Sequence, residues 1–418
     1  MQRLLWRLRT AALFAGCLAR GAFAQRAWTW QEVREKFITA NPTLRAAEIG
    51  IDESKAQEIT AYLRPNPDLT TTLDQLDPFT PNPYRPLANT LPLMSANYLH
   101  ERQHKRELRL ESAQKGTAVT VSQRADLERT LLFNLRNSFL QALQAKAVLS
   151  VARESLAYYD RLLVVSNDRF KAGDIAQVDL DRLELQRVQF ESDVQTAEVN
   201  LRTAKIQLLA LLNDHTPVEQ FDVTGPFEFH EPLVTLEELR AGALATRPDL
   251  QAAVQAVDKA KTDYRLAVAN GSTDPTFSVD VGRNPPIPAY FGVSVSIPLR
   301  LFDRNQGEKQ RTQLDIRRSE GLQEAARTQV LADVESSFAT LNSSLSLLRP
   351  YKTKYLDLAT RVRETISFSY QHGGASLLDF LSAQNDYRSV QLNYLNLVGS
   401  FLAAANQVNL AVGREVIP

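Results

Sequence analysis

The chain has 418 residues, with 48 basic and 48 acidic side chains and one cysteine. Balanced charge gives no support to a nucleic-acid-binding protein, and a single thiol excludes an intrachain disulfide framework. The length exceeds that of one ordinary compact domain and is sufficient for a large core.

The first 24 residues are typical of an export signal. Arg3, Arg7 and Arg9 precede a short apolar stretch, and Ala22-Phe23-Ala24 fits the cleavage pattern of small residues at alternate positions. The apolar stretch is too short to span a bilayer. Removal of residues 1–24 takes away four arginines and no acidic residue, so we expect a mature net charge of −4.

Cys17 allows two interpretations. It ends the segment Leu13-Phe14-Ala15-Gly16-Cys17, which is close to a lipoprotein signal, so it is either discarded with the signal or becomes the lipidated first residue. No later segment approaches about 18 consecutive apolar residues, which predicts that no helix spans a membrane. An exported chain of this kind could still span a membrane as a β-barrel.

The chain is an internal duplication. Asn41-Pro-Thr-Leu-Arg-Ala-Ala matches Arg247-Pro-Asp-Leu-Gln-Ala-Ala at an offset of 206 residues, and residues 169–180 match residues 369–380 at an offset of 200. Self-similarity at a fixed offset indicates that one supersecondary unit occurs twice.

A stripe of apolar residues in alternating steps of three and four follows each matched turn, and only Arg187 interrupts it. Sustained spacing of this kind indicates the seam of a coiled coil, which is core rather than chemistry. The stripe comprises Leu180, Leu183, Phe190, Val194, Ala197, Leu201, Ala204, Leu208 and Leu211 in the first copy, and Phe380, Ala383, Tyr387, Val390, Tyr394, Leu397, Phe401, Ala404, Val408 and Ala411 in the second.

A long helix is predicted before each turn. From residue 101 to residue 169 only Gly116 would weaken a helix, which at 1.5 Å per residue gives a length of roughly 100 Å. Its apolar positions recur at an offset of 199, with Leu156 and Leu163 matching Tyr355 and Val362. Pro350 is expected to kink the second copy.

Two alternating segments precede each long helix and are predicted strands. They are residues 69–75 and 93–99 in the first copy, and 277–281 and 291–297 in the second, each pair separated by prolines. Alternation of apolar with small polar residues gives a strand one apolar and one polar face.

The predicted fold is mainly α with β, built from a duplicated strand-strand-helix-turn-helix unit. We divide the chain into a signal peptide (1–24), a first repeat (25–212), a linker or equatorial segment (213–246), a second repeat (247–413) and a tail (414–418). Four strands cannot close a membrane barrel, because single-chain barrels start at about eight. We therefore expect a trimer that forms a 12-stranded β-barrel and a long α-helical barrel.

The chain resembles the TolC-like family of outer-membrane efflux proteins in its duplicated unit and in the turn segments RFKAGDIAQVDL and YQHGGASLLDFLSAQ. The segments LRPNPDL (63–69) and IPLRLFDRNQGE (297–308) are similar to the branch that serves heavy-metal efflux pumps of the cobalt–zinc–cadmium type. The resemblance implies a passive homotrimeric channel in the bacterial outer membrane, in contact with its lipid, whose helical part lies in the periplasm. It also implies a periplasmic adaptor protein and an inner-membrane pump as partners.

Two other functions stay open. A purely structural coiled-coil envelope protein would explain the helices but not the strands. An exit duct for drugs or secreted proteins would share the fold, and the sequence does not separate it from a duct for heavy-metal cations.

The matched turns carry the candidate sites. Glycine permits a positive φ and close approach of a partner, so we predict adaptor contact at residues 172–174 and 373–375. The resemblance implies that Asp179, Tyr370 and Asp379 form the periplasmic gate, although capping of the returning helix also explains both acids. The chain departs from the family pattern at Ala375 and Ser382, where an arginine and a second acid would stand. The predicted contact residues are Ala172, Gly173, Asp174, Gly373, Gly374 and Ala375.

His100-Glu101-Arg102-Gln103-His104 matches the zinc-protease signature H-E-x-x-H. The motif starts where a strand gives way to a helix, among charged residues, and the second copy has no histidine at the matching positions. We therefore predict no enzyme, no cofactor and no resident metal, with His100 and His104 as a weak candidate pair for zinc. His215, His230 and His372 are scattered.

Overall fold

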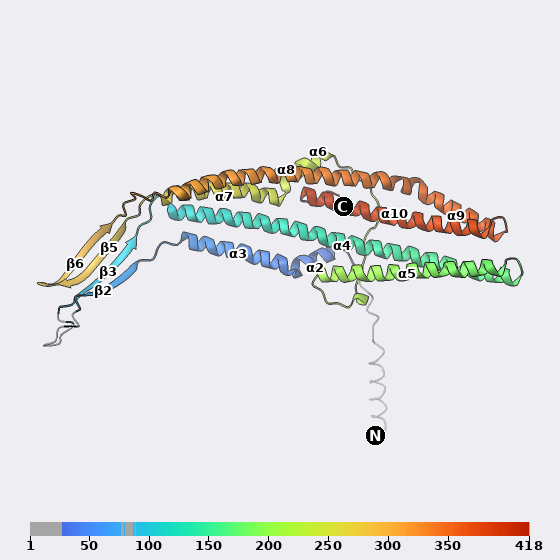
Figure 1. The fold of residues 1–418 in the computed structure, drawn as a ribbon, viewed down its shortest axis with the longest axis horizontal. Helices are drawn as coiled ribbons and strands as arrows, with labels where there is room; N and C mark the ends of the chain where they lie inside the picture. The colour runs from blue at the N-terminus through green and yellow to red at the C-terminus, as the bar shows by residue number, and fades with distance from the viewer. Residues whose placement is uncertain (1–26, 77–78, 80–86, 88, 418) are drawn as a thin grey trace, which may run out of the picture.

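A computed structural model describes residues 27–76, 79, 87 and 89–417. The described chain is elongated, with a β-sheet at one end, two helix-to-helix turns at the other and long helices between them (Figure 1). The predicted signal peptide and Cys17 lie outside the described residues. The mainly helical fold with strands is as the sequence predicts, whereas the domain boundaries stay predictions.

The first half begins with β1 (Ala27–Trp28), α2 (Trp30–Ala40) and α3 (Pro42–Tyr62) and continues with β2 (Asp68–Asp74) and β3 (Leu91–Leu99). The hairpin of α4 (Lys105–Lys171) and α5 (Gln177–Leu211) completes it. In Figure 1, α3 and α5 lie end to end along α4, and both contact it.

The second half follows a short connection that contains the 3-10 helix Val218–Gln220, β4 (Asp222–Val223) and α6 (Leu236–Thr246). It repeats the order with α7 (Pro248–Asn270), β5 (Thr276–Asn284), β6 (Ile287–Ser296), α8 (Gln306–Pro350), a π-helix (Tyr351–Tyr355), α9 (Leu356–Gln371) and α10 (Leu377–Val412). Here α7 and α10 lie end to end along α8, and α4 contacts both of them (Figure 1).

Capping residues define where the helices of both halves begin. Thr29 and Glu32 form a reciprocal capping box at α2, and Thr235 and Glu238 form the same box at α6. In each half the next helix, α3 or α7, begins with a proline. Its missing N–H loses no hydrogen bond there, because the first N–H of a helix has no partner within the helix. The duplication therefore reaches further toward the N-terminus than the sequence match at Asn41.

The predicted seam forms the helical core. The buried seam residues of the first hairpin are Leu180, Leu183, Phe190, Val194, Ala197, Ala204 and Leu208. Those of the second hairpin are Phe380, Ala383, Phe401, Ala404, Val408 and Ala411. By length and composition α10 could cross a membrane, which the sequence analysis did not expect. Half of its most apolar stretch is buried within the chain, where Phe401 and Val408 pack with Val334 and Leu341 of α8.

The kink expected at Pro350 is a π-helix that starts directly after it. A π-helix bonds residue i to i+5 and so takes up one extra residue per turn. This insertion accounts for the change of the repeat offset from 199 before Pro350 to 200 at the turns. The assignment of Tyr355 and Val362 to the apolar stripe was wrong, since both are 42% exposed.

Candidate functional site

The four-stranded sheet has one apolar face that nothing in the described chain covers. The strand order is β2-β3-β5-β6, and every neighbouring pair is antiparallel. Pairing across the strands aligns Leu69 with Ala96, Val279 and Val293, and the row on one side adds Met94, Val281 and Phe291 to a single polar residue, Thr71. The large side chains of this face are 42–74% exposed: Leu69, Leu73, Met94, Phe277, Val279, Val281, Phe291, Val293 and Val295.

The opposite face of the same sheet is mostly polar. Alternation along each strand places the polar residues together, and the register pairs Thr70 with Ser95 and Ser95 with Asp280. The other polar members are Asp68, Thr72, Asn97, Ser278, Ser294 and Ser296. One apolar and one polar face is the arrangement of a sheet with hydrocarbon on one side and water on the other.

Both outer strands of this sheet are open edges. β2 and β6 each pair with one neighbour within the described chain, so each leaves a row of backbone N–H and C=O groups without a strand partner. Such groups are costly next to hydrocarbon unless another strand pairs with them. The outer edges of β2 and β6 are therefore available to pair with further strands.

The two helix-to-helix turns have the same backbone geometry. Gly173 has φ +85° and Gly373 has φ +77°, which only glycine adopts without strain. The Asp174 N–H donates to the Arg169 carbonyl and the Gly374 N–H donates to the Ser369 carbonyl, at 2.9 and 2.7 Å. A positive φ was also expected at Gly374, but the structure has none there.

The predicted gate residues do not share one environment. Tyr370 is 5% exposed, and its ring stacks on Phe380 at 4.9 Å. Burial raises the pKa of Tyr370, Arg169 opposes this rise, and Asp179 adds to it. The buried Ser166 hydroxyl acts on the Tyr370 hydroxyl and lowers its pKa, although no hydrogen bond of ordinary length joins the two within the described residues.

Asp379 is engaged by the helix that it begins. Its carboxylate accepts hydrogen bonds from the Ser376 hydroxyl at 2.7 Å and from the Ser376 N–H at 3.2 Å, which completes a capping box. These bonds hold the pKa of Asp379 below its ordinary value. Asp179 has no such role, because no side chain caps α5.

Arg169 connects the two hairpins beside the predicted gate residue Tyr370, and the sequence analysis did not single it out. Its guanidinium lies 5.4 Å from the centre of the Tyr370 ring and donates to the Tyr370 carbonyl at 3.2 Å. The resemblance implies an arginine where this chain has Ala375. In this chain Arg169, from the first repeat, contacts Tyr370 of the second repeat instead. The repeat pairs Arg169 with Ser369, so comparison of the copies offered no signal for it.

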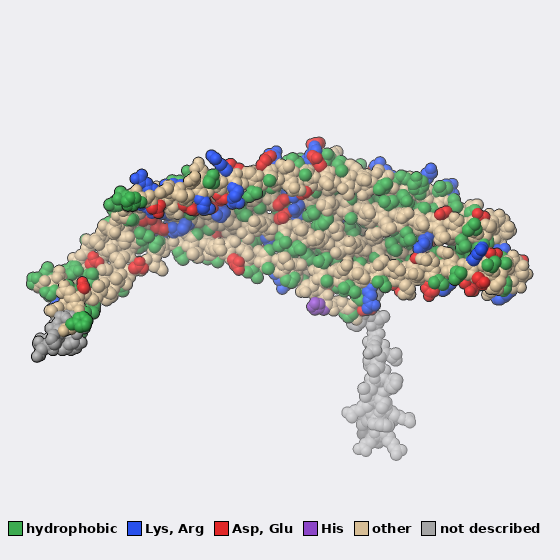
Figure 2. Space-filling view, in the orientation of Figure 1, with side chains coloured by type: hydrophobic (Ala, Val, Ile, Leu, Met, Phe, Trp, Pro, Cys, Tyr) green, Lys and Arg blue, Asp and Glu red, His purple; other side chains and the backbone are tan. Residues whose placement is uncertain are grey.

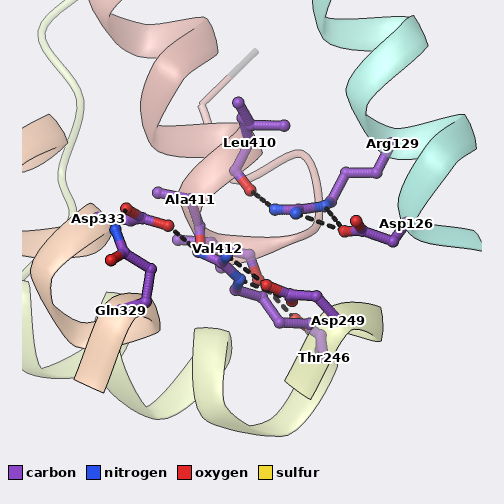
Figure 3. Close-up of polar contacts among 10 residues, drawn as sticks. Asp126, Arg129, Thr246, Asp249, Gln329, Asp333, Leu410, Ala411 and Val412 are labelled. Carbon is purple, nitrogen blue, oxygen red and sulfur yellow. Dashed lines mark hydrogen bonds and ion pairs between the residues drawn. The ribbon is translucent and has the colours of Figure 1, made fainter. Parts of the chain in front are cut away.

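A buried ion-pair centre joins the start of the second repeat to the end of α10 (Figure 3). Arg247, 4% exposed, donates to Asp249 at 2.6 Å, to Asp333 at 2.7 Å and to the Ala411 carbonyl at 3.2 Å. Burial would lower the pKa of Arg247, but its hydrogen bonds with both acids outweigh burial and raise it. Thr246 and Arg129 donate to the neighbouring carbonyls of Val412 and Leu410.

The zinc-protease pattern is not a helical site. α4 begins only at Lys105, and His104 has a left-handed backbone with φ 55°. The His104 side chain is 86% exposed, and the His100 ring packs edge-on against Phe277. Within the described residues no group of three or more His, Cys, Asp or Glu side chains could hold a metal ion.

Comparison with known proteins finds similarity to outer membrane efflux proteins. The profile of the outer membrane efflux protein family matches residues 239–414. The cobalt-zinc-cadmium resistance protein CzcC of Cupriavidus metallidurans is 24% identical over 387 residues, which cover 90% of this chain and 87% of CzcC. The pyoverdine export outer membrane protein OpmQ of Pseudomonas aeruginosa is 24% identical over 358 residues, covering 82% of this chain and 71% of OpmQ.

Solved structures agree in fold. The open-state structure of the MtrE outer membrane channel of Neisseria gonorrhoeae matches with a TM-score of 0.75 and 17% identity, over 93% of this chain and 89% of that one. The matching proteins are outer membrane channels and export proteins rather than enzymes, which confirms that expectation. The duplicated helical fold, the two-faced sheet and these matches make the chain similar to outer membrane efflux proteins.

Proposed function

We propose that this chain is an outer membrane efflux protein and that three copies of it form one exit duct. The observation that carries the proposal is the sheet with an exposed apolar face and two open edges. Pairing β6 of one copy with β2 of the next would satisfy both edges, and three copies would give twelve strands. The apolar faces would then contact lipid and the polar faces would line water.

In this assembly the helices form a tunnel that continues the barrel into the periplasm. α4 has 67 residues, which at 1.5 Å per residue is a helix of roughly 100 Å. The turns at residues 172–174 and 373–375 would lie at the far end, where a periplasmic adaptor protein of an inner-membrane pump docks. The duct itself supplies no energy.

We propose heavy-metal cations as the cargo. The support is the match to CzcC, whose name states cobalt, zinc and cadmium resistance, over nine-tenths of this chain. Three copies of Asp379 around the axis at the narrow end would favour cations. A second candidate is a small organic compound, because OpmQ, named for pyoverdine export, matches at the same identity.

Deletion of the gene separates the two cargo classes. We expect the deletion strain to lose resistance to cobalt, zinc or cadmium, and a plasmid copy to restore it. A copy with Gly374→Glu should be present in the outer membrane in normal amount without restoring resistance. Unchanged metal resistance, together with sensitivity to organic toxins, would reject the metal cargo and favour the organic one.

A further inference from the structure

The corner where β3 meets α4 contains a pocket of about 400 Å³. It lies between Leu99, where β3 ends, and Lys105, where α4 begins, and residues 64 and 65 before β2 close its other side. Side chains that line it include Arg64, Tyr98, His100, Arg102, His104 and Arg106. If the sheet spans the membrane, as proposed above, this corner lies at the periplasmic surface of the bilayer.

Buried contacts hold the backbone of this corner in place. Lys105 is 4% exposed and donates to Asp274 at 2.5 Å and to the Ser272 carbonyl at 3.0 Å. Asp274 also accepts from the Arg102 N–H at 2.9 Å, and the His100 N–H donates to the Pro275 carbonyl. The pocket is therefore attached to the base of β5 and has a defined shape.

The charges around the pocket leave an excess of arginine. Glu101 is paired with Arg109, and Glu107 is paired with Arg106 at 3.0 Å, so both lining acids are neutralised. The Arg64 and Arg102 guanidiniums make no ion pair or hydrogen bond within the described part of the chain. Two free guanidiniums at one pocket favour an anion with oxygen acceptors, above all a phosphate.

The pocket is continuous with the apolar face of the sheet. The His100 ring packs edge-on against Phe277, with 6.4 Å between ring centres, and Phe277 belongs to that face. The matching corner of the second repeat exposes Leu299, Leu301 and Phe302 to 79%, 66% and 90%. Figure 2 shows hydrophobic side chains where the sheet meets the helices, with lysine and arginine side chains gathered over the adjoining ends of the helices.

We propose that the β3–α4 corner binds the headgroup of an anionic phospholipid in the periplasmic leaflet. The phosphate diester lies between Arg64 and Arg102, and the acyl chains lie along the apolar face. Only a lipid combines an anionic phosphate with hydrocarbon, which is what the pocket and the adjoining face together offer. The interaction orients the barrel in the bilayer and fixes its depth at the strand-to-helix corners.

The test is native mass spectrometry of the purified protein in detergent, titrated with phosphatidylglycerol and, separately, with inorganic phosphate. The variant Arg64→Gln/Arg102→Gln should bind phosphatidylglycerol roughly 30-fold more weakly, since each arginine near an anionic lipid contributes about 5-fold. Arg64→Lys/Arg102→Lys retains the charges and should retain most of the binding. The matched control is Arg327→Gln/Arg361→Gln, which removes two exposed arginines far from the corner and should change nothing.

Three results would overturn the proposal. Equal lipid binding by the glutamine variant would remove both arginines from the site. Equal affinity for inorganic phosphate would make the pocket a free oxyanion site. A weakened oligomer with unchanged lipid binding would assign the corner to the neighbouring copy, whose β6 would approach Arg64. The oligomer mass and the channel conductance, measured on the same samples, distinguish failure of this inference from failure of the proposed duct.

Discussion

Arg247 is a charged side chain in the interior of the molecule, and its matched residue in the first copy is Asn41. Asn41 caps its own helix by accepting from the Leu44 N–H at 3.0 Å, whereas Arg247 bonds to α8 and α10. Asn41 and Arg247 therefore have different structural roles, although they occupy matching positions in the two repeats. The second copy uses its residue to join the C-terminal end of α10 to the start of α7, where a cation near a helix C-terminus is favourable.

Replacing Arg247 with alanine should lower the free energy of unfolding by about 3 kcal/mol, because it leaves two acids and a helix end without their partner. The control is Arg318→Ala, which removes an exposed pair with Asp315 and should cost below about 1 kcal/mol. Thermal unfolding of the two variants in the same detergent measures the difference. Equal midpoints would show that the buried centre does not stabilise the fold.

The gate hypothesis predicts weaker cation selectivity after a change at Asp379 and higher leak conductance after a change at Tyr370. Asp379→Asn retains a capping oxygen but removes the charge, so it should weaken cation selectivity in planar bilayers without loss of assembly. Tyr370→Phe removes the hydroxyl beside Ser166 that the gate hypothesis uses as a lock, so it should raise the leak conductance.

Asp181→Asn is the matched control, since Asp181 is an exposed acid in the first turns of α5 and lies outside the proposed gate. Unchanged selectivity in a correctly assembled Asp379→Asn channel would leave Asp379 as a helix cap alone. Selectivity that falls equally in both variants would assign the effect to overall charge.

At the scale of elements, periodicity predicted the hairpins and the strands well. Seam spacing located the buried faces of α5 and α10, and alternation located the four strands to within a few residues. Both signals arise because one side of a regular helix or strand is buried, so apolar residues recur in the sequence at the period of that element. β1 and β4 have two residues each and carry no periodicity, so nothing in the sequence indicated them.

Features that depend on contacts between the copies were not predictable. Arg169 reaches Tyr370 across 201 residues, and Lys105 reaches Asp274 across 169. The π-helix was recognisable only as a proline and a change of offset, and the sequence analysis interpreted it as a simple kink. The capping boxes of α2 and α6 did have a signal, Thr-x-x-Glu before an apolar helix, which the comparison of the copies overlooked.

The turns allow a direct test of adaptor docking. Gly374→Glu places a charged side chain on the turn at a residue without a positive φ, so it should abolish efflux while the amount of assembled protein stays normal. Gly173→Glu should do the same but also strains the turn, because Gly173 has φ +85°. Gly321→Glu, on α8 with open space around it, is the control. Efflux that survives both turn variants would exclude the turns as the contact.

At the scale of the whole molecule, we propose that a single chain is one part of a closed assembly. The described chain leaves one apolar sheet face and two strand edges exposed, and the proposed assembly would provide neighbours for both. A closed assembly removes the edges, covers the helices and gives the apolar face a lipid environment. Two copies would give the eight strands of a narrow barrel and three would give twelve, and we propose three because the chain resembles trimeric channels.

The mass of the native complex in detergent tests this account most directly. Native mass spectrometry of the purified protein should give one species with three chains, and circular dichroism of the same sample should retain the β-content of the sheet. A stable single chain with that full β-content would contradict the account, because the open edges of β2 and β6 would then need no partner.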